Sequence, residues 1–329
     1  MFGINQKKYL NLSLCVVFVS LGLICLLPGL AASGPREGKE TARVIMVGDR
    51  LVDIAYNLGV LPEAMVVRCI WPAASSELNS VRSLGCPKYV TIKNKGAVAK
   101  FAATTGIKRI LIENSKDFSL YAPDVNPMKV VAQLEGKGFD VESVDFSDGI
   151  ESAIEQMGRL LNREAKAGEL IKSYKSRLKK SLKRMPDKKQ NKKVLILRGI
   201  PVGNTGKFFV QVEASKGYSD RFFLKPMGCE NRADLLQSKG TQVTKGYFLL
   251  KNMADIAKAN PDVIIITGES FPVQKALSKH SSLFDIPAVK NHEIYSLPLY
   301  IDSSVIEYPN ILMQWTSALC KQATPRRGP

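Results

Sequence analysis

Histidine is nearly absent from this sequence, which has 329 residues and only 2 histidines, His280 and His292. A site that binds bare zinc or manganese needs roughly three or four His, Cys or carboxylate ligands. The 6 cysteines include no Cys-x-x-Cys pair, so a structural zinc site has no sequence support either. Both histidines flank residues 283–289, and we expect them at the surface.

Motifs that carry catalysis are also missing. There is no Gly-x-Ser-x-Gly elbow, no phosphate loop of the Gly-x-x-x-x-Gly-Lys type, and no histidine near a plausible nucleophile. Residues 203–207 echo a phosphate loop but are too short, and we interpret residues 199–207 as a flexible cleft loop. The sequence therefore predicts that the protein is not an enzyme.

The N-terminus has the order of a secretory signal. Lys7 and Lys8 precede an apolar run over residues 12–27, which Pro28 and the small residues 31–33 follow. We expect residues 1–32 to be a signal peptide and the protein to be periplasmic. A retained membrane anchor is the alternative, since the run is only a little shorter than the roughly 18 residues of a spanning helix. A lipid anchor on Cys25 is disfavoured by the bulky Ile24 before it.

Cleavage would remove Cys15 and Cys25 and leave an even number of thiols in an oxidising compartment, where pairing is possible. These are Cys69, Cys86, Cys229 and Cys320.

The net charge of +17 is concentrated in one segment. Residues 163–193 contain 13 Lys or Arg against Glu164, Glu169 and Asp187. Aromatic residues do not interleave with these cations, except at Tyr174, and no nucleic-acid motif is present. The pattern predicts one solvated basic helix and no nucleic-acid binding.

The chain has a repeated α/β pattern. In residues 105–113 and 259–268, a Gly or Pro is followed by an unbroken run of aliphatic residues. A strand with one exposed face would alternate apolar and polar residues, so these runs are typical of buried parallel strands. Residues 43–48 and 193–199 predict the first strand of each half. Helical spacing of apolar residues over 150–161 and 170–185 predicts a long helix between them, ended by Pro186. We predict an α/β fold in which a single long rigid helix joins two lobes with parallel sheets, with a ligand cleft between the lobes.

The boundaries that follow are a signal at 1–32, an N-terminal α/β lobe at 33–162, a bridging helix at 163–190 and a C-terminal α/β lobe at 191–329. Within the lobes we further expect strands at 65–69, 88–92 and 294–297. Helices are expected at 51–58, 97–104, 218–225 and 253–259, with a C-terminal helix carrying Ile311, Leu312, Trp315 and Leu319.

A family resemblance rests on the order of several short sequence segments. They lie at residues 43–47 with 56–59, 160–165, 228–231, 260–264, and 286–289 with 294–298. Together they resemble the helical-backbone (class III) periplasmic substrate-binding proteins of ABC importers for ferric siderophores, haem and cobalamin. The resemblance covers nearly all of the mature chain and is more specific for the fold than for the ligand.

The resemblance implies a monomer that holds no intrinsic cofactor, binds a ferric siderophore, haem or a corrinoid, and meets an ABC permease in the inner membrane. It implies a disulfide between Cys229 and Cys320, although Cys229 is displaced by about two residues from the family position. Cys69 and Cys86 are interpreted as free buried thiols.

Two docking positions depart from the family pattern. Relatives carry one surface Glu on each lobe for Arg residues of the permease, whereas Lys100 and Ala254 occupy the aligned positions here. Either the partner permease has changed its charge pattern to match, or this protein serves another partner such as a membrane sensor.

Ligands of open α/β lobes meet the loops at the carboxyl ends of parallel strands. That rule selects Arg50, Trp71, Glu113 and Asn114 from the first lobe, and Arg198, Glu269, Phe271 and Tyr300 from the second. The arginines offer planar forks to an anionic edge, and the aromatic residues offer apolar cover. A solvated surface role is the alternative for each arginine, and packing against its own loop is the alternative for Trp71. At Tyr300 the resemblance adds an aromatic ligand contact.

Two hypotheses of function remain open. The first is an exported binding protein that delivers a metal chelate to an ABC importer. The second is an exported protein of the same fold that presents its ligand to a membrane sensor or assembly partner.

Overall fold

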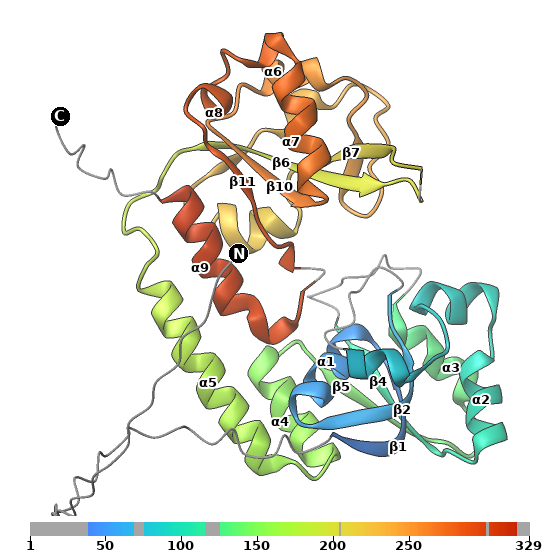
Figure 1. Cartoon of the computed structure of the whole chain (residues 1–329). Helices are drawn as coiled ribbons and strands as arrows, with labels where there is room; N and C mark the ends of the chain where they lie inside the picture. The colour runs from blue at the N-terminus through green and yellow to red at the C-terminus, as the bar shows by residue number, and fades with distance from the viewer. Residues whose placement is uncertain (1–38, 69–75, 116–125, 204, 301–302, 321–329) are drawn as a thin grey trace, which may run out of the picture. The chain divides into compact units, whose positions relative to one another are not determined.

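The computed structural model describes residues 39–68, 76–115, 126–203, 205–300 and 303–320. Two α/β lobes are joined by helix α5 (Glu164–Leu182), so the predicted fold class is confirmed (Figure 1). In this part of the chain, no helix has both the length and the apolarity needed to cross a bilayer. The apolar run at residues 12–27 lies outside the described residues.

The N-lobe has a five-stranded sheet of order β3-β2-β1-β4-β5, and all its strand pairs are parallel. Its strands are β1 (Glu40–Val47), β2 (Val60–Val66), β3 (Arg82–Ser83), β4 (Arg109–Asn114) and β5 (Asp140–Asp145). Its helices are α1 (Asp49–Asn57), α2 (Ala97–Thr105), α3 (Val131–Leu134) and α4 (Ile150–Leu160). The continuous apolar sequences of β1 and β4 are explained by burial, because helices cover both faces of the sheet.

The C-lobe has a mixed sheet of order β11-β10-β6-β7-β9, with β8 also paired to β6. Its strands are β6 (Lys193–Pro201), β7 (Phe208–Glu213), β8 (Glu230–Asn231), β9 (Tyr247–Leu249), β10 (Val263–Gly268) and β11 (Ile294–Ser296). Its helices are α6 (Ile256–Ala259), α7 (Ser270–Lys279), α8 (Pro287–Lys290) and α9 (Tyr308–Leu319). The pairs β6–β7 and β7–β9 are antiparallel, which the expectation of parallel sheets did not foresee.

Two local predictions were wrong. Residues 88–92 form no strand, because Tyr89–Lys93 is a π-helical turn in which the Thr91 hydroxyl donates to the Pro87 carbonyl at 2.7 Å. The expected cleft loop begins inside β6, which runs to Pro201 and turns back into β7. Gly199 is required within β6, because a Cβ there would lie 2.0 Å from the backbone oxygen of Glu269.

The C-terminal part of the chain returns to the N-lobe after the C-lobe sheet is complete. Val305 and Ile306 are buried in the N-lobe core together with Ile171 and Tyr174 of α5. Tyr308 packs against the core clusters of both lobes. The expectation of a single helix between the lobes was therefore incomplete, because the lobes share two connections, namely α5 and the segment before α9.

Polar contacts fix this returning segment. One oxygen of the buried Asp53 carboxylate, on α1, accepts hydrogen bonds from the Ser304 hydroxyl and the Val305 amide, both at 2.8 Å. Arg177 of α5 donates to the Glu307 carboxylate at 2.9 Å and to the Ile306 carbonyl at 3.0 Å. Burial raises the pKa of Asp53 to about 6, although both hydrogen bonds from the segment act in the opposite direction.

Replacing Asp53 by Asn should remove the buried charge and keep an acceptor oxygen. Between the ordinary aspartate pKa of 3.8 and the folded pKa of about 6, folded Asp53 binds a proton more tightly than unfolded Asp53. Its contribution to the free energy of unfolding therefore falls as the pH rises through this window. The variant should gain up to about 3 kcal/mol relative to the wild type between about pH 4 and about pH 7. Urea unfolding across this range measures the difference, and parallel pH profiles would contradict the assignment.

The predicted disulfide is not formed in the structure, where Cys229 and Cys320 are free thiols. Both pack against the same apolar cluster, and the Cys320 thiol donates to the Met227 sulfur at 3.7 Å. Burial raises the pKa of Cys229 to about 11, so little of the reactive thiolate exists at neutral pH. Cys86 is also a free thiol, and Cys69 lies outside the described residues.

The pairing stays a prediction for the exported protein. Closing this loop of about ninety residues should raise the free energy of unfolding by up to about 4 kcal/mol in the chain-entropy model. Peptide mapping without reductant should find the Cys229–Cys320 peptide pair. The double variant Cys229→Ser, Cys320→Ser is the control for stability, and complete alkylation of both native thiols would exclude the bond.

Candidate functional site

The carboxyl ends of β1 and β4 meet at a tight turn. Gly48 has φ +134°, and a Cβ there would lie 2.3 Å from the Cβ of Glu113. Only glycine allows this approach, which sets Asp49 and Arg50 at the start of α1 beside Glu113. All three side chains are buried.

These residues form an ionic network within the N-lobe. The Arg50 amide donates to Glu113 Oε2 at 3.0 Å, and Arg50 Nε lies 4.0 Å from Glu113 Oε1. The Arg50 guanidinium also lies over the Phe146 ring, 5.6 Å from its centroid. Arg68, which follows β2, donates to the Asp49 carboxylate through both its amide and its side chain. Burial raises the pKa of Glu113, an effect that the charge of Arg50 opposes.

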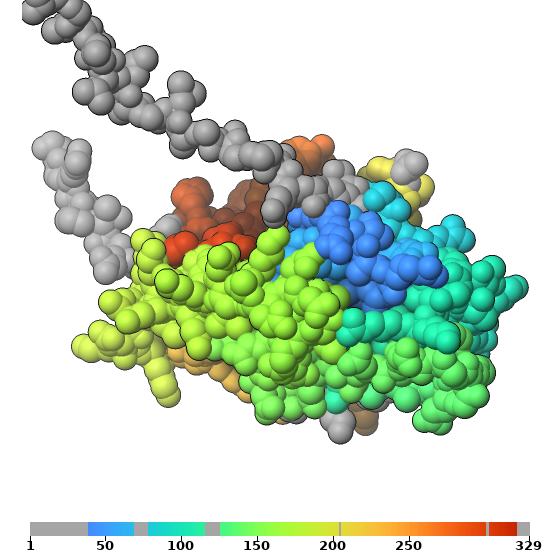
Figure 2. Space-filling model, turned by 90° about the horizontal axis from the view of Figure 1, so that it is seen from below, coloured from blue at the N-terminus to red at the C-terminus, as the bar shows by residue number. Residues whose placement is uncertain are grey.

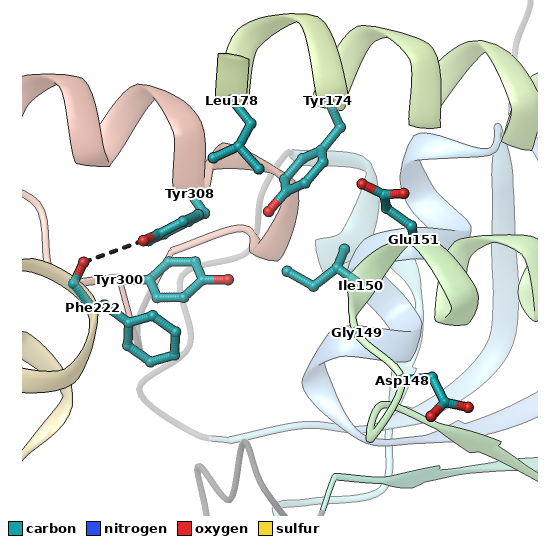
Figure 3. Close-up of a pocket in the computed structure, with 9 residues that line it drawn as sticks. All are labelled: Asp148, Gly149, Ile150, Glu151, Tyr174, Leu178, Phe222, Tyr300 and Tyr308. Carbon is teal, nitrogen blue, oxygen red and sulfur yellow. Dashed lines mark hydrogen bonds between the residues drawn. The ribbon is translucent and has the colours of Figure 1, made fainter. Parts of the chain in front are cut away.

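A cavity of about 300 Å³ lies among elements of both lobes (Figure 3). The start of α4 forms one side, α5 forms the roof, and C-lobe residues form the remaining wall. Its lining residues are Asp148, Gly149, Ile150, Glu151, Tyr174, Leu178, Phe222, Tyr300 and Tyr308. This volume is at the low end of the range for small-molecule sites.

The C-lobe wall is an aromatic cluster. The Phe222 ring meets Tyr300 edge to face at 5.1 Å between centroids, and Tyr300 lies 5.0 Å from Tyr308. The Tyr308 hydroxyl donates to the Phe222 carbonyl at 3.2 Å, and the Tyr300 hydroxyl donates to the Val305 carbonyl at 3.3 Å. Two hydroxyls are thus held by the backbone, so the rings present mainly apolar surface.

Tyr174 differs from these residues. It projects from α5 into the cavity, and its hydroxyl has no hydrogen-bond partner among the described residues (Figure 3). Burial raises its pKa, so the hydroxyl stays protonated and can donate to a ligand.

The side of the cavity that the start of α4 forms is acidic. Asp148 is exposed, and Glu151 in the first turn of α4 forms an ion pair with Lys175 at 2.7 Å. Negative charge at a helix N-terminus is favourable without a ligand. No group of three or more His, Cys, Asp or Glu capable of holding a metal occurs within the described ranges.

The structure brings some of the predicted contacts together and separates others. Tyr300 lines the cavity, while Arg50 and Glu113 lie in the buried N-lobe network. The charge of Arg50 nevertheless reaches Tyr300, since it lowers the pKa of that residue against the larger effect of burial. Trp71 lies outside the described residues.

The remaining predicted residues have other neighbours. Asn114 donates to Asp145 at 3.2 Å, and the Arg198 guanidinium lies 5.1 Å from the Tyr247 ring centroid. Glu269 is exposed and Phe271 is 73% exposed. Of the docking positions, Lys100 is exposed on α2, and Ala254 is half-buried in a 3-10 turn. The roles of all these residues stay predictions.

Sequence reasoning missed Tyr174, Phe222 and Tyr308 as cavity residues. Tyr174 was assigned to the apolar stripe of a helix, and it does lie there. Tyr308 does not follow a parallel strand, so the rule that selects residues at strand ends could not find it. Tyr218 does not line the cavity but extends its aromatic wall, and it was also missed. It stacks on Phe222 at 5.7 Å, and its pKa of about 12 reflects burial first, opposed by Arg50 and Arg68 across the lobes. A tyrosine in an otherwise aliphatic helical stripe was the one available signal.

Comparisons with known proteins agree on the family. The model of the family described as "Periplasmic binding protein" matches residues 114–300. The high-affinity heme uptake system protein IsdE of Staphylococcus aureus is 27% identical over 197 residues, which cover 58% of this chain and 61% of that protein. The chain thus spans less than two thirds of this curated relative.

Solved structures share the fold. The periplasmic heme-binding protein BhuT, solved with two hemes, has a TM-score of 0.57 and 17% identity, over 85% of this chain and 99% of that one. The periplasmic heme binding protein HutB of Vibrio cholerae has a TM-score of 0.55 and 18% identity, over 85% and 100%. Identities this low establish the architecture only.

Tyr300 should contribute to stability mainly through its ring. Tyr300→Ala leaves a cavity in the aromatic cluster and should lower the free energy of unfolding by about 3 kcal/mol. Tyr300→Phe loses only the bond to the Val305 carbonyl and should cost about 1 kcal/mol. Denaturant unfolding measures both, and similar losses in the two variants would show that the ring packs less tightly than described.

Proposed function

Because this chain belongs to the periplasmic binding protein family, we propose that it is exported and binds a flat metal chelate for delivery to an ABC importer. The observation that carries this proposal is the aromatic wall of the cavity, in which Phe222, Tyr300 and Tyr308 from one lobe face Tyr174 of the connecting helix. Offset and edge-on aromatic contacts suit a planar conjugated ligand.

Haem is the first candidate within the chelate class. The names of IsdE, BhuT and HutB describe haem uptake or haem binding, and haem offers a planar face for the aromatic wall. Its two carboxylates would suit basic residues at the cavity edge. Arg221 is exposed and lies over the Phe222 ring, 5.6 Å from the centroid. Ferric siderophores and corrinoids remain candidates, because the aromatic wall alone does not select among chelates.

The test is a titration of the purified protein with ferric haem, a ferric siderophore and cobalamin, followed by ligand absorbance and tryptophan fluorescence. Haem should bind at micromolar concentration or tighter. Phe222→Ala should weaken binding by about ten- to a hundredfold, as is typical of a buried aromatic contact.

Phe284→Ala provides the matched control, because Phe284 is 51% exposed and does not line the cavity. Tyr174→Phe should weaken binding about fivefold without unfolding the protein, since only the unpartnered hydroxyl is lost. Equal affinities of the Phe222 and Phe284 variants, or the absence of binding by every chelate, would reject the cavity as the site.

A second candidate function is presentation of the ligand to a membrane sensor or assembly partner. Lys100 and Ala254 favour it, because neither supplies the carboxylate that importers of this family meet with arginine. Acidic residues facing Lys100 in a permease encoded nearby would favour import instead.

A further inference from the structure

Helix α5 has two faces of opposite character. Four of its side chains are buried against the lobes, namely Ala167, Ile171, Tyr174 and Ser181. On the other side, exposed lysines recur every three or four residues, at Lys172, Lys175, Lys179 and Lys183. This spacing places them in one stripe along the helix, which we call the lysine stripe.

The protein itself neutralises only part of the positive charge of this region, because Lys175 and Arg177 alone have ion-pair partners among the described residues. Residues 171–191 contain 9 Lys or Arg and a single acidic residue, Asp187. Lys175 is paired with Glu151, but Lys172, Lys179 and Lys183 have no ion-pair partner among the described residues. Like charges along one helix face repel, so the stripe lowers helix stability unless an anionic partner offsets it.

An apolar side chain accompanies the stripe. Leu182 is 51% exposed and is the last residue of α5, directly before Lys183. Figure 2 shows the yellow-green surface of α5 open on this face of the molecule. Lysines around an exposed leucine are typical of a helix that lies on a membrane surface.

We propose that the lysine stripe and Leu182 form a docking surface for a bilayer of anionic phospholipids. Lysine is a compact charge on a flexible stem, which suits a fluid array of headgroups better than the fixed geometry of an acidic protein site. Leu182 supplies apolar area that can enter the headgroup region, whereas a soluble polyanion offers nothing to receive it.

Docking leaves the ligand site accessible. Tyr174 and Leu178 line the cavity from the lobe-facing side of α5, whereas Lys172, Lys179 and Lys183 are exposed. Lys175 alone reaches the cavity edge, where it pairs with Glu151. A protein docked through the other three lysines would therefore keep the cavity lining of α5 away from the bilayer. The proposal does not depend on the identity of the ligand.

The test is flotation of the exported protein with vesicles of phosphatidylcholine alone, or of phosphatidylcholine and phosphatidylglycerol in equal parts. Anionic vesicles should bind the protein, and raising the salt from about 0.1 M to about 1 M should release it as the screening length falls from about 10 Å to about 3 Å. The triple variant Lys172→Gln, Lys179→Gln, Lys183→Gln should bind about 100-fold more weakly, at roughly one fivefold step per lysine.

The matched control is Lys275→Gln, Lys279→Gln, Lys290→Gln, which removes the same charge from exposed C-lobe positions. It should bind as the wild type does. Leu182→Ala should weaken binding to anionic vesicles about fivefold at about 0.1 M salt. Thermal unfolding and chelate titration of each variant separate a loss of docking from a loss of fold or ligand binding. Equal loss in the two triple variants, equal binding to neutral and anionic vesicles, or binding only to an acidic protein would overturn the proposal.

Discussion

The hydrogen bonds between Asp53 and the segment before α9 determine the arrangement of the site. They tie helix α1 of the N-lobe to backbone that belongs, in sequence, to the end of the C-lobe. Val305 and Ile306 follow into the N-lobe core, and the Val305 carbonyl holds the Tyr300 hydroxyl. The orientation of the aromatic wall therefore depends on a carboxylate in the opposite lobe.

The ionic network at the strand ends has a separate effect. Asp49, Arg50, Arg68 and Glu113 neutralise one another inside the N-lobe, and each is held by at least one hydrogen bond or ion pair. Buried charges are tolerated only when they are paired in this way. The two arginines thus stay inside the N-lobe, at the carboxyl ends of its strands. Burial raises the pKa of Tyr218 and of Tyr300, and the charge of Arg50 opposes this rise in both.

The sequence predicted those parts of the structure that depend on local patterns. Strands such as β1 and β10 are buried on both faces, so their apolar runs identified them, and the spacing of Leu170, Tyr174 and Leu178 identified α5. The π-helical turn at Tyr89–Lys93 was predicted as a strand because its β-branched and aromatic residues favour strands, and the antiparallel β7 was missed because the turn before it was interpreted as a cleft loop. The cavity was predicted only in part. Tyr300 was found from the strand-end rule and a family resemblance, whereas Tyr174 and Tyr308 converge only through tertiary packing.

The second connection between the lobes also constrains the order of folding. The N-lobe core contains Val305 and Ile306, which are made after the whole C-lobe sheet. A chain that emerges N-terminus first can form strands β1 to β5 early, but it cannot close that core until its last helix follows. These contacts join residues separated by some 250 positions, as between Asp53 and Val305, so their formation carries a large loop-closure entropy. The N-lobe core is thus completed only after the segment that precedes α9 has been made, and until then the surface that receives Val305 and Ile306 stays open to solvent.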